Sequence, residues 1–191
     1  GESVAVIGVG GVGLSVVQAA ANLGAYPVIV IDLADEKLEF AKQFGATHGI
    51  NASKGDPIKA VQDLMGGGFG AGVDHAFDAI GSGRTMEQIL HMARARQPGE
   101  REGGQAILVG VPHGETPPLP MGMLFGGKVY RGAPGGSSIP DRDFPILIRW
   151  FKEGKFPLDK MVTKRYKLEQ INEGCDALAK GQIAGRAIVE F

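Results

Sequence analysis

The chain has 191 residues, and its hydrophobic (43%) and charged (21%) fractions are those of a soluble globular protein. A net charge of −1 excludes an ordinary nucleic-acid-binding surface, which needs a surplus of lysine and arginine on one face. The sequence contains no apolar run of transmembrane length and no signal-peptide pattern, and its single cysteine, Cys175, has no partner for an internal disulfide. We therefore expect a cytoplasmic protein with neither a membrane nor a nucleic-acid partner.

Short apolar runs alternate with helical patterns in the first two thirds of the sequence. Residues 3–7 are typical of a strand buried on both faces of a parallel sheet. In chain order we predict strands at 3–7, 28–31, 48–51, 73–77, 105–111 and 128–133, helices at 11–23, 35–44, 57–65 and 82–95, and loops at 66–72 and 112–122. This alternation predicts an α/β fold, a doubly wound parallel Rossmann sheet of about six strands.

A different pattern follows residue 134. We predict a helix at 141–152, a strand at 160–166, a helix at 168–180 and a strand at 187–191. A Rossmann sheet does not need these elements. We therefore divide the chain into a Rossmann domain, 1–134, and a short α+β C-terminal segment, 135–191, that packs onto something else.

A glycine-rich turn lies between the first predicted strand and the first predicted helix. Gly8, Gly10 and Gly13 form a G-x-G-x-x-G pattern in the segment GVGGVG, and Gly11 adds a fourth glycine. Asp32 follows about 20 residues later, at the end of the second predicted strand. Strand, glycine turn, helix and acid in this order predict a dinucleotide site.

Each residue of the pattern has a physical role. Gly8 permits the tight turn, Gly10 lets a pyrophosphate approach the amides at the helix N-terminus, and Gly13 lets the helix pack closely on the strand. Asp32 can accept hydrogen bonds from ribose hydroxyls, and its charge repels a 2′-phosphate, which favours NAD over NADP. The residues alone leave two alternatives: a tight turn with Asp32 as a helix N-cap, and an S-adenosylmethionine or flavin site.

The segment 4–14, VAVIGVGGVGL, resembles the coenzyme-binding half of the medium-chain, zinc-dependent alcohol dehydrogenases. Further similar segments are 44–47 (FGAT), 72–74 (GVD), 77–81 (FDAIG), 108–112 (LVGVP) and 171–174 (INEG). The resemblance covers the whole chain in order, and it is near the branch that includes class III enzymes, which oxidise thiol adducts. It implies that the catalytic domain of the family, N-terminal to this half, is absent from the sequence.

The resemblance implies two charged residues that bind the cofactor. Lys37 corresponds to a lysine that contacts the adenosine ribose, and Arg186 to an arginine that closes over the pyrophosphate. Solvated surface positions are the alternative for both side chains.

The resemblance also implies apolar and backbone contacts with NAD. Val12 would support the nicotinamide ring, and Ile80 with Gly81 would lie beside the adenosine and its ribose. The segment Val109, Gly110 and Val111 would line the nicotinamide, and the backbone of Val109 and Ala133 would hold its carboxamide. Ordinary core packing is the alternative for Ile80 and the valines.

The family transfers hydride between an alcohol or aldehyde and NAD, with the substrate oxygen on a zinc ion. Its zinc ligands lie in the absent domain, so we assign no catalytic residue and no metal ligand to this chain. Cys175 shares a helical face with Leu168, Ile171 and Leu178, which predicts core packing. His48, His75 and His91 lie on separate elements. His113 follows the fifth strand, and the sequence leaves open whether it contacts the substrate or lies in an exposed surface loop.

The resemblance implies a role for the C-terminal segment as well. In the family this part of the chain returns to the catalytic domain, so we expect Phe151, Phe156 and Leu158 to be partly exposed and to favour self-association. Family dimers pair the sixth strand, which makes 128–132 the expected homodimer edge. Two other readings are a zinc-free quinone or enoyl reductase, which usually lacks an acid at the position of Asp32, and a non-catalytic NAD-binding module.

Overall fold

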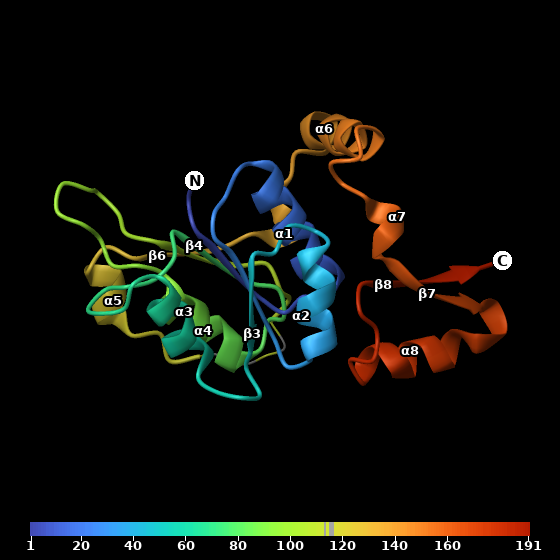
Figure 1. Cartoon of the computed structure of the whole chain (residues 1–191), viewed down its shortest axis with the longest axis horizontal. Helices are drawn as coiled ribbons and strands as arrows, with labels where there is room; N and C mark the ends of the chain where they lie inside the picture. The colour runs from blue at the N-terminus through green and yellow to red at the C-terminus, as the bar shows by residue number, and fades with distance from the viewer. Residues whose placement is uncertain (113, 115–116) are drawn as a thin grey trace.

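Six parallel strands form the main sheet of the computed structural model, which describes residues 1–112, 114 and 117–191 (Figure 1). They are β1 (Val4–Ile7), β2 (Val28–Asp32), β3 (His48–Asn51), β4 (His75–Asp78), β5 (Gln105–Leu108) and β6 (Val129–Gly132). Their order is β3-β2-β1-β4-β5-β6, and every neighbouring pair is parallel. The predicted doubly wound sheet is confirmed, and the strand order reverses between β1 and β4, where such sheets have their ligand crevice.

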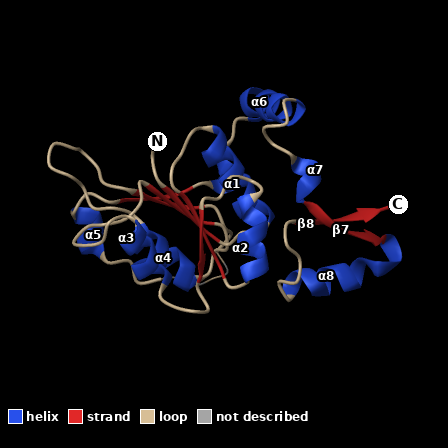
Figure 2. Cartoon of the chain, in the orientation of Figure 1, coloured by secondary structure: helices blue, strands red, loops and turns tan. Residues whose placement is uncertain are grey.

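Helices cover both faces of this sheet. On one face lie α1 (Gly11–Asn22) and α2 (Asp35–Lys42); on the other lie α3 (Pro57–Leu64), α4 (Gly83–Met92) and the short α5 (Met121–Phe125) (Figure 2). Successive side chains of a strand point to opposite faces. Accordingly Val4 and Val6 join the core beneath α1 and α2, whereas Ala5 and Ile7 join the core beneath α3 and α4.

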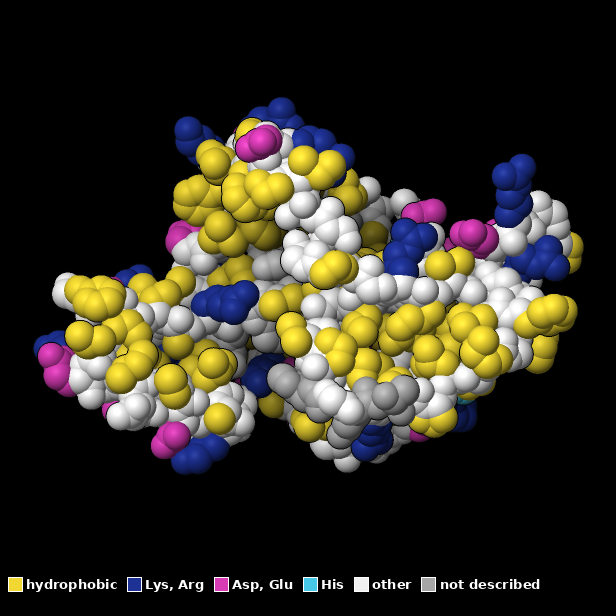
Figure 3. Space-filling view, turned by 180° about the vertical axis from the view of Figure 1, so that it is seen from behind, with side chains coloured by type: hydrophobic (Ala, Val, Ile, Leu, Met, Phe, Trp, Pro, Cys, Tyr) yellow, Lys and Arg dark blue, Asp and Glu magenta, His cyan; other side chains and the backbone are white. Residues whose placement is uncertain are grey.

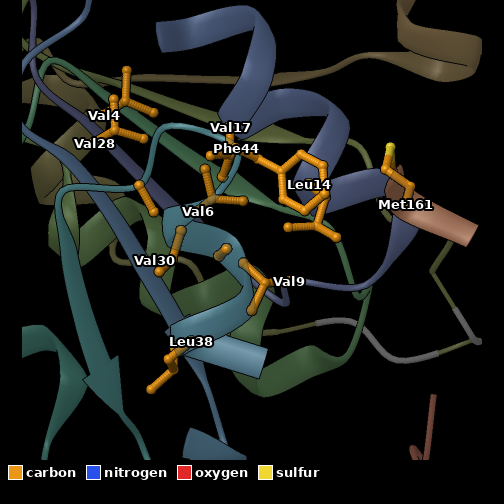
Figure 4. Packing of buried hydrophobic residues seen from close by; sticks show 12 residues of the cluster. Val4, Val6, Val9, Leu14, Val17, Val28, Val30, Leu38, Phe44 and Met161 are labelled. Carbon is orange, nitrogen blue, oxygen red and sulfur yellow. The ribbon is translucent and has the colours of Figure 1, made fainter. Parts of the chain in front are cut away.

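The core beneath α1 and α2 holds the first helix against the strand that precedes the glycine turn (Figure 4). Leu14 and Val17 of α1 are fully buried there, and Leu38 contributes from α2. Burial of an aliphatic side chain of this size stabilises the fold by about 1.5–3 kcal/mol. The direction of α1, and with it the position of its N-terminus, is therefore fixed by packing.

The C-terminal segment lies beside α1 and α2, outside the main sheet (Figure 1). Its elements are η1 (Pro134–Ser137), α6 (Pro140–Lys152), α7 (Leu158–Met161), β7 (Val162–Lys167), η2 (Leu168–Gln170), α8 (Ile171–Ala179) and β8 (Arg186–Glu190). β7 and β8 pair in parallel in a separate two-stranded sheet. The segment thus has the α+β character that its sequence predicts.

Met161 anchors this segment to the sheet domain. Its side chain is 2% exposed and belongs to the same core cluster as Leu14 and Val17 (Figure 4). The side-chain amide of Gln18 donates a hydrogen bond to the Met161 sulfur at 3.1 Å. Part of the C-terminal segment therefore packs against α1.

Two strands differ in extent from the prediction. β4 begins at His75, because the backbone of Val73 pairs with Ala93 in an isolated bridge outside the sheet. β5 ends at Leu108, because the N–H groups of Val109 and Gly110 both donate to the main-chain oxygen of Asp78 at 2.9 Å. The chain therefore turns over the end of β4 at a point where the apolar pattern predicts continued strand.

The sequence did not predict the helices α5 and α7. Each has five residues or fewer, and α5 begins inside the Pro/Gly-rich segment 112–122, which was expected to be a loop. Within the described part of the chain, no helix combines the length and the apolar character needed to cross a membrane.

Two predictions about the C-terminal segment are wrong. Phe156 is buried: the chain reverses after α6, where the Phe156 N–H donates to the carbonyl of Trp150, and the side chain lines an apolar hollow with Phe144 and Phe151 of that helix. Cys175 is exposed, because α8 approaches β7 through Gly174 and leaves its apolar side uncovered. Phe151 and Leu158 are partly exposed, as expected.

Candidate cofactor site

The glycine turn lies at the carboxyl end of β1, where the strand order reverses. Gly8 has a φ of 86°, and a Cβ on it would lie 2.5 Å from Cγ1 of Ile80. A Cβ on Gly13 would overlap the carbonyl oxygen of Gly8, so α1 packs directly on the turn. A Cβ on Gly10 would have no described atom within 4 Å apart from its chain neighbours. The fold itself thus requires Gly8 and Gly13, whereas Gly10 leaves its backbone open to an approaching group.

Asp32 ends β2 beside this turn and holds it in place. One carboxylate oxygen accepts the Val9 N–H at 3.0 Å, and the other accepts the Leu33 N–H at 2.8 Å. The N-cap of α2 is Ala34, so Asp32 is not the helix N-cap of the alternative interpretation. The acid is therefore held close to the glycine turn, at the predicted ribose position.

Lys37 lies in the first turns of α2 and extends toward the C-terminal segment. Its ammonium nitrogen is 3.7 Å from the place that a Cβ on Gly181 would occupy. The side chain is half-buried, and the part of the chain that the structure describes gives it no ion-pair partner. Its charge is thus available near the carboxyl end of β2.

The loops after β4 and β5 meet over the glycine turn. Gly81 has a φ of 89°, and a Cβ on it would lie against the carbonyl of Val111. A Cβ on Gly110 would likewise lie against the backbone of Ile80 and Gly81. The structure therefore brings Gly8, Ile80, Gly81, Gly110 and Val111 together, although they come from three separate parts of the sequence.

Asp78 is the residue that organises this loop, and sequence reasoning missed it. Its side chain is fully buried and accepts hydrogen bonds from the N–H groups of Ile80 (2.8 Å) and Gly81 (3.1 Å) and from the hydroxyl of Thr85 (3.1 Å). Burial raises the pKa of the Asp78 carboxyl, and the three donors oppose that shift. The available signal was an acid directly after an apolar strand, followed by a glycine three residues on.

Arg186 reaches the turn from the far end of the chain. It is the first residue of β8, and the preceding Gly185 pairs with Gly10 in an isolated parallel bridge. The guanidinium group lies so close to Gly11 that a Cβ there would overlap it. A cation thus stands at the N-terminus of α1, where the helix dipole and free N–H groups also favour an anion.

The remaining predicted contacts line the same edge of the sheet. Val12 is 40% exposed on the first turn of α1. Val109 and Ala133 directly follow the neighbouring strands β5 and β6, and the Ala133 N–H donates to the carbonyl of Leu108 at 2.8 Å. Leu33, which sequence reasoning did not select, is also exposed beside Asp32.

The described residues hold no group of three or more histidine, cysteine, aspartate or glutamate side chains able to bind a metal ion. His48 and His75 lie in β3 and β4, and His91 lies in α4. His113 is outside the described residues. A zinc ion therefore has no fitting site in the part of the chain that the structure describes.

Comparison with known proteins gives one family. The zinc-binding dehydrogenase family profile matches residues 11–153. The chain is 34% identical to the class-3 alcohol dehydrogenase of Cereibacter sphaeroides, over its whole length and 50% of that protein. It is 32% identical to the S-(hydroxymethyl)glutathione dehydrogenase of Paracoccus denitrificans, with 95% of the chain and 48% of that protein covered.

Solved structures agree with this assignment. The benzyl alcohol dehydrogenase of Acinetobacter calcoaceticus superimposes with a TM-score of 0.86 at 33% identity, covering all of this chain and 49% of that one. The chain thus spans about half the length of the relatives that it matches. Since the family profile covers most of the sequence, the chain belongs to the zinc-binding dehydrogenases, within the medium-chain alcohol dehydrogenases.

Proposed function

We propose that this chain is the NAD-binding part of a zinc-dependent, alcohol-dehydrogenase-like oxidoreductase. The observation that carries the proposal is the convergence of the glycine turn, Asp32 and Arg186 at the reversal of strand order. An anion-binding helix end, an acid for ribose hydroxyls and an arginine for phosphate are the groups that a dinucleotide needs.

The pyrophosphate would lie against Gly10 and Gly11. The open backbone at Gly10 admits a phosphate oxygen, and the N-terminus of α1 supplies N–H donors. Arg186 would cover the second phosphate, since its planar fork can make two parallel hydrogen bonds to one phosphate group.

The adenosine ribose would lie between Asp32 and Lys37. The Asp32 carboxylate already accepts three backbone N–H groups, from Val9, Leu33 and Ala34, and its remaining acceptor capacity is open to the ribose hydroxyls. A 2′-phosphate would meet this negative charge, so NAD is favoured over NADP. Ile80 and Gly81 would border the same ribose.

The nicotinamide end would lie at Val12 and the loops after β5 and β6. Val109, Gly110 and Val111 would line the ring, and the backbone of Val109 and Ala133 would hold the carboxamide. When bound, the nicotinamide of NAD would accept the hydride. The residues of this chain would bind and orient the cofactor, and we propose no proton transfer by any of them.

The alcohol or aldehyde and the catalytic zinc would be held by a separate catalytic domain. Without that domain we expect this chain to have no dehydrogenase activity. We expect the protein to be cytoplasmic. The apolar side chains spread over one face of the molecule and around α6 support such a covering domain (Figure 3). A groove of about 580 Å³ between α1 and the sheet has Val16, Leu23, Phe77 and Ile107 among its walls and offers a further apolar surface to such a domain. β6 is an edge strand of the main sheet, which fits a homodimer through 128–132.

A zinc-free reductase of the same superfamily and an NAD-sensing module without catalysis are the competing functions. Asp32 favours the dehydrogenase over the first, because NADPH-dependent reductases usually lack an acid there. For the second, a Cys- and His-bearing domain in the same full-length protein would exclude a purely sensory role.

Calorimetry on the chain tests the cofactor assignment. We expect NADH to bind more tightly than NADPH. Asp32→Gly should lower the affinity for NADH by about tenfold and reduce the preference for NADH over NADPH, because one bidentate acceptor and its charge are lost. Arg186→Ala should weaken ADP-ribose by a similar factor. Unchanged NADH affinity and preference in Asp32→Gly would contradict the ribose site, and unchanged ADP-ribose affinity in Arg186→Ala would contradict the pyrophosphate site.

A further inference from the structure

Gly185 is the residue of the C-terminal segment that contacts the glycine turn. It directly precedes Arg186 and pairs with Gly10 in a parallel bridge. Its φ is 81°, in the left-handed region that favours glycine. The backbone at Gly185 therefore determines where the Arg186 side chain starts.

The space around Gly185 admits no side chain. A Cβ there would overlap the carbonyl oxygen of Met161 and would lie 3.1 Å from Cε1 of Phe40. Neither neighbour can move easily. Met161 is buried in the core beside Leu14, and the Phe40 ring packs edge-on against Phe44, with ring centroids 5.0 Å apart.

A displaced Gly185 would carry Arg186 with it. The guanidinium group now lies directly on Gly11, at the N-terminus of α1. Bidentate contacts between a guanidinium and a phosphate depend on geometry, and a displacement of about 1 Å is enough to weaken them. The strand can reach this place only because residue 185 has no Cβ.

We propose that Gly185 is a positioning residue for dinucleotide binding: its close fit between Met161 and Phe40 sets the Arg186 guanidinium against the pyrophosphate position. The inference rests on the proposed function and adds to it a residue that does not itself touch the cofactor. It assigns the C-terminal segment a part in cofactor affinity, separate from its expected contact with a catalytic domain.

Gly24 provides a matched control. Its φ is also 81°, and a Cβ on it would meet no described atom within 4 Å. Gly24→Ala and Gly185→Ala both place an alanine at the same positive φ, and only the second adds a collision. Any loss specific to Gly185→Ala reports the fit between Met161 and Phe40.

The first experiment compares ADP-ribose with adenosine, which has no phosphate. We expect Gly185→Ala to lower the affinity for ADP-ribose by about tenfold. The affinity for adenosine, measured by NMR titration, should stay within about twofold of the wild-type value. Gly24→Ala should leave both within about twofold. Equal weakening of both ligands in Gly185→Ala would overturn the proposal, since a general disturbance of the fold would then explain the loss.

The second experiment is a double-mutant cycle with Arg186→Ala. If Gly185 acts through the arginine, the double variant should bind ADP-ribose no more weakly than Arg186→Ala alone. Fully additive losses would overturn the proposal. Should Gly185→Ala not fold, Ile183→Ala, which loosens a buried anchor two residues earlier, enters the same cycle with an expected loss of about threefold. If Arg186→Ala by itself leaves the affinity for ADP-ribose unchanged, the proposed pyrophosphate site is wrong, whatever the effect of Gly185→Ala.

Discussion

At the scale of single residues, Asp78 shows how a buried acid can shape a site without facing the ligand. Its carboxylate accepts two backbone N–H groups of the loop after β4, and its main-chain oxygen accepts two from the loop after β5. A buried N–H group without an acceptor costs about 1–3 kcal/mol. Both loops thus depend on one residue at the end of one strand.

Asp78→Ala should therefore lower the free energy of unfolding by about 2–4 kcal/mol, because the Ile80 and Gly81 N–H groups lose their acceptor. Asp78→Asn is the control, since it keeps one oxygen acceptor and its amide can donate to the Thr85 hydroxyl. Urea unfolding measures both variants. Equal losses in the two variants would show that the charge, rather than the acceptor, is what the loop needs.

Lys128 gives a pH-dependent prediction. Burial lowers the pKa of Lys128 to about 8 from an ordinary value of 10.5, although its ammonium group donates to the Leu90 carbonyl at 3.0 Å. Below pH 8 both folded and unfolded chains hold the proton, and the burial penalty is fully present. Between about pH 8 and 10.5 the folded chain has released a proton that the unfolded chain still binds, so stability rises with pH.

Urea unfolding of the wild type and of Lys128→Met should show this difference. The free energy of unfolding of the wild type, relative to the variant, should increase from pH 8 to 10.5 and then level off. A flat difference across this range would mean that the Lys128 pKa is close to its ordinary value.

At the scale of elements, the first strand, the glycine turn and α1 are the part that the sequence predicts best. Their local signals all agree: an apolar strand, glycines at fixed spacing and a helical pattern. The start of β4 and the end of β5 were predicted less well, because partners distant in sequence set them: the Val73 N–H donates to the Met92 carbonyl, and the loop after β5 donates to the Asp78 carbonyl. A single sequence carries no local sign of such partners.

Gly13→Ala and Gly10→Ala should separate folding from binding within this element. A methyl group on Gly13 would overlap the Gly8 carbonyl, so we expect a loss of about 1–3 kcal/mol of unfolding free energy. A methyl group on Gly10 meets open space, so stability should change by less than about 1 kcal/mol. NADH affinity should nevertheless fall in Gly10→Ala. A Gly10→Ala variant that binds NADH normally would remove this glycine from the proposed site.

At the scale of the whole molecule, two apolar surfaces are uncovered. One is the groove between α1 and the sheet, and the other is the face of α6 that carries Phe144, Leu147, Ile148 and Phe151 (Figure 3). The resemblance predicted exposure at Phe151 and Leu158, but the burial of Phe156 depends on a chain reversal that no pattern indicates. Cys175 was misplaced for the converse reason, because an apolar helical stripe does not show whether anything covers it.

Ile148→Glu should reduce self-association of the chain. Ile148 is more than half exposed, and its burial between two copies would contribute about 1.5–3 kcal/mol, so the dissociation constant should rise at least about tenfold. Lys152→Gln changes the net charge equally on the same helix and should have little effect. Sedimentation velocity over a concentration series measures both. A monomeric wild type would show that the α6 face does not pair.

The bridge between Gly10 and Gly185 joins nearly opposite ends of the sequence. During synthesis the glycine turn therefore leaves the ribosome well before the arginine that stands over it. A nascent chain can complete its main sheet and still lack the Arg186 cation at the phosphate position until residue 186 has been translated. Cofactor binding is on these grounds a later event than folding of the sheet, and a chain truncated just before Gly185 should keep the sheet and bind nucleotide more weakly.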